Sequence, residues 1–195
     1  FGHGITATPL QVANAYAAIA NGGTLHRPYI VKAIKDPETG EVTDAKPKVI
    51  RRVMGEVEAA KLRLMLAAVT NKDGTGFNAR VPGFPVAGKT GTAQKVNPNG
   101  RGYMRGAYIS SFAGFLPAND PRFVIYIAVD HPRKEYYGSA VAAPVFSRVA
   151  KFAGNLADHG RRDSRLAFTG EGLAAELDQD AAVAGGLGTG VRHDR

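Results

Sequence analysis

The chain has 195 residues, of which 44% are hydrophobic and 8% aromatic, so it can build a sizeable hydrophobic core. It carries 25 Lys and Arg against 17 Asp and Glu, but the basic residues are scattered and accompany no RNA-binding or recognition-helix motif, so we expect no nucleic-acid partner. No run of about 18 apolar residues occurs, and we therefore expect no membrane-spanning helix within it. Because it begins with Phe1 and no signal-like segment follows, we expect an internal or C-terminal piece of a longer protein.

The first predicted element is a helix from Pro9 to about Ala20. Thr8 and Gln11 have the spacing of a capping box, and Pro9 stands at the first helical position, where its missing N–H is harmless. The residues 21–23, Asn-Gly-Gly, are typical of a helix C-terminus. Small alanine side chains on this helix indicate close packing against another element.

A hairpin and a second helix are predicted next. Residues 27–34 alternate polar and apolar side chains, which is typical of a strand, and residues 36–40 have turn composition. Residues 42–53 are expected to run back along the first strand, so the segment predicts a peripheral hairpin. Residues 56–70 show helical spacing of apolar side chains, and we expect these to pack in the core: Leu62, Met65, Leu66 and Val69. The glycine-rich residues 71–76 lack the spacing of a phosphate-binding loop, so we expect no nucleotide site there.

The segment Gly83–Lys95 is predicted to be a strand with a polar centre. Thr90 and Thr92 are two residues apart, so both hydroxyls lie on one face of an extended chain. Gly91 between them leaves the backbone open to close approach, and Lys89 adds a cation. These groups are suited to binding a carboxylate. The alternative is an exposed, threonine-rich edge strand without a ligand.

Two further strands, at 107–116 and 123–129, follow short turns and complete an antiparallel meander. Both faces of the first are largely apolar, which predicts layers on both sides of the sheet. The last predicted helix spans about 140–152. Residues 154–195 have little large apolar content, so we expect a mostly disordered tail with a short helix near 172–184. The predicted fold class is α+β, an antiparallel sheet flanked by helices.

Four groups of residues stand in one order along the chain: 2–5 with 8–11, 15–17 and 21–23; 88–93; 111–115; and 136–138 with 143–146. Together they resemble the C-terminal half of the transpeptidase domain of class B penicillin-binding proteins, the division-type peptidoglycan D,D-transpeptidases. The resemblance covers residues 1–153 and implies the penicillin-binding protein and β-lactamase-like fold, with part of the sheet and the nucleophile upstream of Phe1.

This chemistry needs a serine in an S-x-x-K motif, a second motif S-x-N, and K-T-G. Only K-T-G is present, since no serine of the chain has Lys three residues on or Asn two residues on. The resemblance implies catalytic roles for Lys89, through its ammonium, and Thr92, through its backbone N–H as an oxyanion donor. It also implies that Thr90, Gly91 and Thr92 bind the carboxylate of a D-Ala-D-Ala stem peptide or a β-lactam. We expect the parent to cross-link peptidoglycan through a serine acyl-enzyme, and this chain alone to be inactive.

Further binding residues are implied in the loop after the last strand. Tyr136, Tyr137 and Gly138 resemble a loop that forms an apolar wall over bound ligand, although the two tyrosines could instead be ordinary surface residues. Tyr108 is expected to face the same cleft. His3 is expected to be a hydrogen-bonded structural residue. The remaining histidines lack metal-ligand spacing, so we expect no metal or other cofactor.

Two other classes of function stay open at this point. Loss of two motifs is compatible with a truncated, non-catalytic binding or scaffold module of the cell-wall or division machinery. D,D-carboxypeptidases and serine β-lactamases also contain K-T-G. The family resemblance implies a parent at the periplasmic face of the inner membrane, anchored by an N-terminal segment, with division or elongation membrane proteins as partners.

Overall fold

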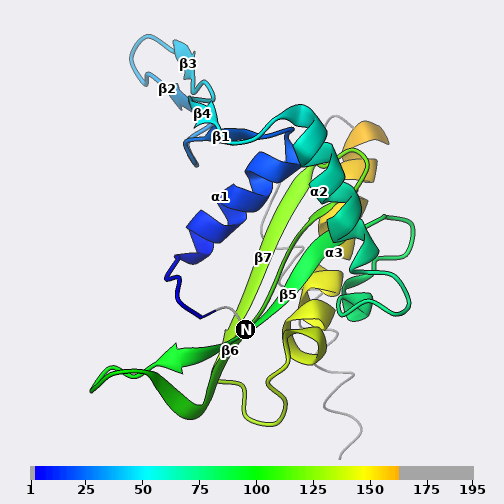
Figure 1. Cartoon of the computed structure of the whole chain (residues 1–195). Coiled ribbons are helices and arrows are strands. Elements are labelled where there is room, and N and C mark those ends of the chain that lie inside the picture. Colours follow the sequence, from blue (N-terminus) through cyan, green and yellow to red (C-terminus); the bar gives the residue numbers. More distant parts are fainter. Residues whose placement is uncertain (1–2, 163–195) are drawn as a thin grey trace, which may run out of the picture. The chain divides into compact units, whose positions relative to one another are not determined.

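The computed structural model describes residues 3–162. The chain divides into two compact units, Phe1–Gly154 and Asn155–Arg195, and the sheet lies in the first. The elements, shown in Figure 1, are α1 (Pro9–Ala20), β1 (Thr24–His26), β2 (Ala33–Lys35), β3 (Val42–Asp44), β4 (Val49–Arg52), α2 (Glu56–Ala68), a 3₁₀ turn (Phe77–Ala79), β5 (Ala87–Val96), β6 (Tyr103–Leu116), β7 (Phe123–Asp130) and α3 (Gly138–Arg162).

Helix α1 begins with the predicted capping box. The Gln11 backbone N–H donates to Thr8 Oγ1 at 3.2 Å, and the Thr8 N–H donates to Gln11 Oε1 at 2.8 Å. The helix ends at Ala20 with Asn21 as its C-cap, so both predicted boundaries are confirmed. Ala18 and Ala20 are buried, as close packing of this helix requires.

The central sheet is an antiparallel meander in the order β5-β6-β7. On one face, Phe112 packs against Phe146 of α3, with ring centroids 4.6 Å apart. On the other face, Phe115 and Ala87 pack with Ala20 of α1 and residues of α2. The predicted α+β class, with helices on both faces of an antiparallel sheet, is therefore confirmed (Figure 1).

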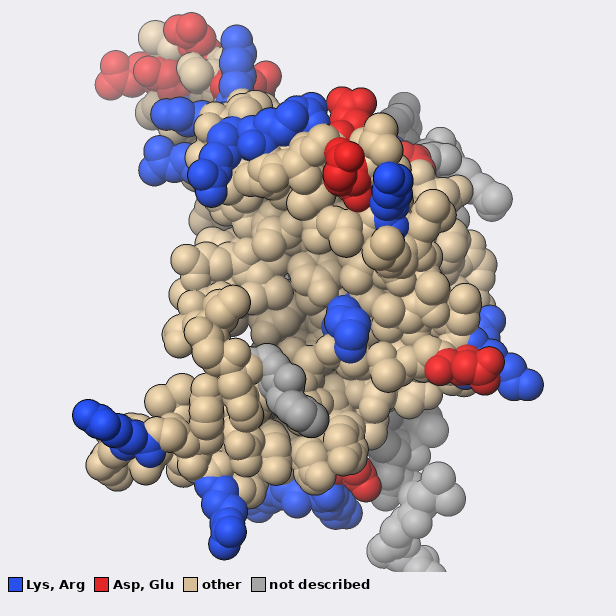
Figure 2. All heavy atoms as spheres, in the orientation of Figure 1, with Lys and Arg blue, Asp and Glu red and all other residues tan. Residues whose placement is uncertain are grey.

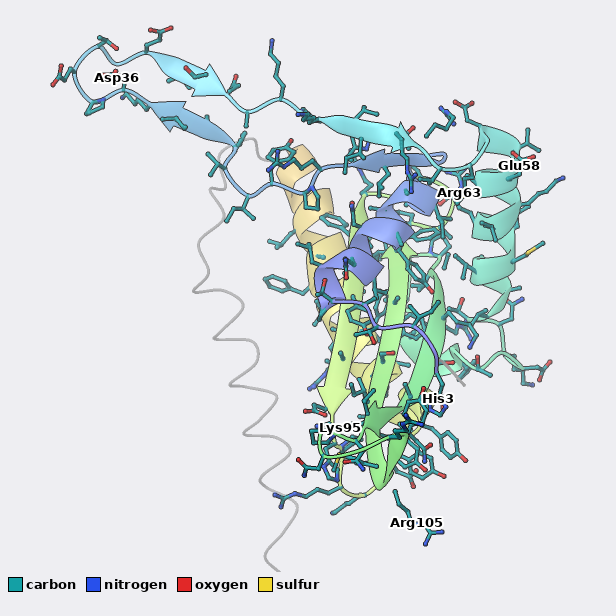
Figure 3. The ribbon with its side chains drawn as sticks, turned by 60° about the vertical axis from the view of Figure 1, so that its left-hand side comes forward. His3, Asp36, Glu58, Arg63, Lys95 and Arg105 are labelled. Carbon is teal, nitrogen blue, oxygen red and sulfur yellow. The ribbon has the colours of Figure 1, made fainter. Side chains whose placement is uncertain are left out.

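The predicted hairpin is split into two short ladders. Strand β1 pairs with β4 and β2 pairs with β3, while residues 27–32 belong to no strand. Pro28 has no N–H to donate to a ladder, which accounts for the break. Figure 2 shows basic side chains over the β1–β4 ladder. It shows acidic side chains at the tip of the β2–β3 ladder, where Asp36 lies in Figure 3.

Helix α2 packs through a narrower stripe than predicted. Leu66 and Ala67 contact the buried cluster, and Ala59 is fully buried. The prediction that Met65 packs in the core is wrong, since 64% of its surface is exposed. Met65 is one residue from Leu66 and thus turns about 100° away from α1 around the helix axis.

Helix α3 is longer than the predicted 140–152. It continues to Arg162, so residues 154–162 of the tail predicted to be disordered are helical. Gly154 lies inside the helix, where it packs closely on Phe84: an added Cβ would meet that ring at 2.9 Å. Because the helix starts at Gly138, Pro144 lies in its second turn. The remaining tail and its predicted helix at 172–184 lie outside the described residues, and the domain boundary after residue 153 stays a prediction.

Candidate active site

Strand β5 carries the Lys-Thr-Gly-Thr sequence at one edge of the sheet. Two hydrogen bonds identify the backbone groups that point away from β6: Thr90 O accepts from Lys89 Nζ at 3.0 Å, and the Gln94 N–H donates to His3 Nε2 at 3.1 Å. In an antiparallel ladder, alternate residues turn their N–H and C=O to the same side. Thr92 lies midway between Thr90 and Gln94, before the irregularity at the end of the strand, and it therefore turns both backbone groups to the open edge.

A groove of about 580 Å³ lies between the N-terminal segment, α1 and the sheet, and its lining reaches from β5 across β6 to Tyr126 of β7. It contains Lys89, Thr90, Gly91 and Thr92, so the structure brings these predicted site residues together. A second lysine in the groove, Lys95, is paired with Asp130 at 2.7 Å across β6. Within residues 3–162, no carboxylate forms an ion pair with Lys89, which leaves the groove a cation for an anionic ligand.

The two threonine hydroxyls share a face, as the strand spacing predicts, and each contacts another element. Thr90 Oγ1 accepts from Lys89 Nζ at 3.0 Å and donates to Thr75 Oγ1 at 3.3 Å. Thr92 Oγ1 accepts from the backbone N–H of Gly138 at 3.0 Å. Among residues 3–162 this hydroxyl donates to no other group, so its proton can be donated to a ligand.

Gly138 is a close-packing residue at the start of α3. An added Cβ would approach the backbone oxygens of Gly91 and Ser111 to well within 3.0 Å, so no larger residue fits without a shift. A larger residue at Gly91 is also disfavoured, because a Cβ there would lie 2.5 Å from Ser111 Oγ. The start of α3 therefore rests directly on the β5–β6 backbone.

The predicted aromatic residues form a stack next to this contact. The rings of Tyr108 and Tyr136 are 4.3 Å apart at 15°, and Tyr136 and Tyr137 are 4.5 Å apart at 33°. The hydrogen bond between the Tyr136 and Tyr137 hydroxyls, at 3.2 Å, raises the pKa of Tyr136. Buried Ser110 donates to the Tyr136 carbonyl and holds the loop. These tyrosines and Gly138 do not line the β5 groove. Of the four, Gly138 is bonded to Thr92, through its backbone N–H.

Sequence reasoning missed three contributors to the site. Thr75 anchors Thr90, Ser110 holds the tyrosine loop, and Tyr103 packs on His3. Local signals for them are weak: Thr75 lies in a loop whose composition indicates only a turn, and Tyr103 lies 100 positions after His3. The predicted hydrogen-bonded role of His3 agrees with its contact to Gln94.

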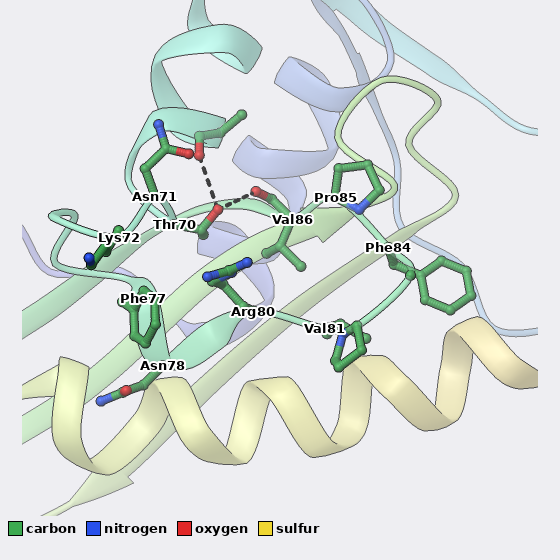
Figure 4. A pocket seen from close by; sticks show the side chains of 13 residues that line it. Thr70, Asn71, Lys72, Phe77, Asn78, Arg80, Val81, Phe84, Pro85 and Val86 are labelled. Atoms are coloured by element: carbon green, nitrogen blue, oxygen red, sulfur yellow. Dashed lines mark hydrogen bonds between the residues drawn. The ribbon is translucent and has the colours of Figure 1, made fainter.

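A larger cavity of about 960 Å³ lies between the end of α2 and the segment before β5, and shares no residue with the groove (Figure 4). Thr70 Oγ1 donates there to the carbonyls of Ala67 and Val86, which ties α2 to β5. In the described part of the chain, no three His, Cys, Asp or Glu side chains gather as a metal site would require. Nor is any helix there long and apolar enough to cross a membrane.

The antiparallel sheet with its open K-T-G edge can now be compared with known proteins. The family model for the penicillin binding protein transpeptidase domain matches residues 1–151, so the chain belongs to that family. Stage V sporulation protein D of Bacillus subtilis is 43% identical over 153 residues, covering 77% of this chain and 23% of that protein. Peptidoglycan D,D-transpeptidase FtsI of Escherichia coli is 38% identical over 150 residues, with 76% and 23% coverage.

Solved structures give the same fold. The crystal structure of penicillin binding protein 3 from Mycobacterium tuberculosis, complexed with ampicillin, matches with a TM-score of 0.72 and 38% identity, covering 80% of this chain and 36% of that one. The recognition of a class B penicillin-binding protein and of its fold is thereby confirmed. The chain spans about a quarter of the length of these curated relatives, 23% in each case.

Proposed function

We propose that this chain is the C-terminal part of the transpeptidase domain of a longer peptidoglycan D,D-transpeptidase. In that protein, the open edge of β5 binds the D-Ala-D-Ala end of a stem peptide, or a β-lactam in its place. The observation that carries the proposal is the outward-facing backbone of Thr92 beside the ammonium of Lys89, which has no carboxylate partner in residues 3–162. A peptide carbonyl and a terminal carboxylate are the groups that such an edge accepts.

The reaction follows from these groups and a serine supplied by an S-x-x-K motif upstream. The serine oxygen attacks the carbonyl between the two D-Ala residues, and its proton passes to the departing D-Ala amine. The amine of a neighbouring stem peptide then takes the acyl group and releases the serine. The Thr92 N–H stabilises the oxyanion of both steps, and removing one such donor costs about 3–4 kcal/mol in comparable sites. Lys89 supplies a positive field that favours the substrate carboxylate.

Labelling with a fluorescent penicillin tests this proposal. The longer protein, with its S-x-x-K and S-x-N motifs, should be labelled covalently, whereas the 195-residue chain should not, since it lacks both motifs. Labelling of this chain alone would overturn the assignment of the nucleophile to an upstream segment. Failure of the longer protein to label would instead favour a non-catalytic binding or scaffold module.

The setting of the activity follows from its substrate. Peptidoglycan lies outside the cytoplasmic membrane, so we assign the site to the periplasmic face of the inner membrane, with an anchor outside this chain. Division or elongation membrane proteins are the partners that we propose for the longer protein. The M. tuberculosis relative complexed with ampicillin supports a β-lactam as an alternative ligand of the same edge.

A further inference from the structure

The N-terminal segment is bonded to the edge of β5 directly beyond Thr92. The Gln94 N–H donates to His3 Nε2 at 3.1 Å. The His3 ring stacks on Tyr103 with centroids 4.0 Å apart and planes 19° apart, and the Tyr103 hydroxyl accepts from the Gly4 N–H at 3.2 Å. Figure 3 shows His3 at the same end of the sheet as Lys95. Three contacts therefore hold residues 3 and 4 against the end of the groove.

Protein groups thus occupy the edge on both sides of Thr92. Lys89 holds the Thr90 carbonyl, and His3 holds the Gln94 N–H. Between them, no group within residues 3–162 bonds to the N–H or C=O of Thr92. Because a ladder residue exchanges both hydrogen bonds with one residue opposite, one residue of an extended ligand can pair fully with Thr92.

Charge fixes the direction in which a peptide ligand runs. Its terminal carboxylate is drawn toward the Lys89 ammonium, at the beginning of the exposed edge. Its N-terminal part then extends toward Gln94, antiparallel to β5. The next ladder position on that side would require the Gln94 N–H, which His3 already accepts.

We propose that the His3–Tyr103 pair is a register stop, which ends the ligand-binding edge at Gln94. The site then takes the last two residues of a peptide along β5 and directs the preceding residues away from the strand. This inference rests on the proposed function, because it requires a carboxylate-terminated peptide in the groove. It makes His3 a specificity-determining positioning residue, supported from behind by the ring and hydroxyl of Tyr103.

The chemistry of the stop determines which substitutions test it. His3 accepts from Gln94 only with its ring proton on Nδ1, because a neutral imidazole has one donor and one acceptor nitrogen. The side-chain carbonyl of glutamine is also an acceptor, so His3→Gln preserves the contact. His3→Ala removes it and frees the Gln94 N–H for a longer ligand.

Steady-state release of D-Ala by the longer protein provides the first test. N-acetyl-D-Ala-D-Ala is compared with a peptide extended by two residues at its N-terminus. His3→Ala should raise the ratio of kcat/KM for the long over the short peptide by about 2- to 10-fold, as expected for one added hydrogen bond of about 0.5–1.5 kcal/mol. His3→Gln should keep the wild-type ratio. An unchanged ratio in His3→Ala, or equal losses for both peptides, would overturn the register stop.

Amide hydrogen exchange provides a second test that needs no turnover. The Gln94 amide should exchange slowly in the wild type and in His3→Gln, and rapidly in His3→Ala. Equally fast exchange of this amide in all three proteins refutes the stop. If the wild-type protein cleaves neither peptide while Gln94 remains protected, the proposed transpeptidase function fails. The hydrogen bond from Gln94 to His3 would then exist without limiting the length of a bound substrate, and the register stop would be overturned as well.

Discussion

Gly138 joins α3 to the K-T-G strand, and its replacement by alanine is a sharp test of the site. The new Cβ would lie inside 3.0 Å of two backbone oxygens, those of Gly91 and Ser111, whereas ordinary contact begins at 3.4 Å. Neither oxygen can move freely, because both strands are held in the ladder. The start of α3 must therefore withdraw by more than 0.4 Å, the difference between 3.4 and 3.0 Å.

This withdrawal has two measurable consequences. It stretches the hydrogen bond from Gly138 to Thr92 Oγ1 from 3.0 Å to beyond 3.4 Å, and overpacking of this kind typically costs about 1–3 kcal/mol of unfolding free energy. Since a displacement of about 1 Å can reduce a catalytic rate about 100-fold, a withdrawal of this size predicts acylation slowed by roughly tenfold or more. Denaturant unfolding and the rate of penicillin labelling of the longer protein measure the two effects.

Gly100→Ala is the matched control. Its Cβ would meet only the side-chain amide of Asn97, at 3.3 Å, in an exposed turn. We expect this variant to retain both wild-type stability and wild-type acylation. Wild-type acylation in Gly138→Ala would refute the reasoning, because the start of α3 would then not position Thr92.

Two further predictions concern exposed hydrogen bonds. Thr75→Val removes the acceptor of the Thr90 hydroxyl. Acylation should slow about 2- to 10-fold with unchanged stability, which is the effect of one hydrogen bond worth about 0.5–1.5 kcal/mol. A wild-type rate of acylation would contradict this prediction. In the turn between β2 and β3, the backbone N–H groups of Thr39 and Glu38 lower the pKa of Asp36. The ionised carboxylate thus stabilises the turn above its ordinary pKa of 3.8, and this contribution is lost as the pH falls through the lowered value. The Glu38 and Thr39 amide shifts should titrate in this acidic range, but not in Asp36→Asn.

Local rules predicted the elements whose causes are local. The capping box at Thr8 and Gln11 and the stop after Ala20 fix α1 within its own sequence. The continuous apolar run from Phe123 fixes β7 in the same way. The role of Gly154 inside α3 could not be predicted, because the ring that leaves no room for a Cβ there belongs to Phe84, 70 positions away.

In the site, too, the contiguous residues could be predicted from the sequence and the distant ones could not. Lys89–Thr92 is a contiguous pattern, and its spacing alone predicts a hydroxyl face and an open backbone. The groups that position it come from Thr75 and His3, which are 15 and 91 residues away from their partners Thr90 and Gln94. The stacking of Tyr108 on Tyr136 likewise depends on tertiary contacts. Their predicted role in ligand binding stays a prediction.

A crystal structure of the longer protein acylated by a penicillin tests the central claim most directly. If the β5 edge supplies the oxyanion donor, the acyl carbonyl oxygen should lie about 2.7–3.1 Å from the Thr92 backbone nitrogen. The penicillin carboxylate should lie within hydrogen-bond distance of the Thr90 or Thr92 hydroxyl. An acyl group whose carbonyl oxygen points away from Thr92, or whose carboxylate contacts neither threonine, would contradict the account.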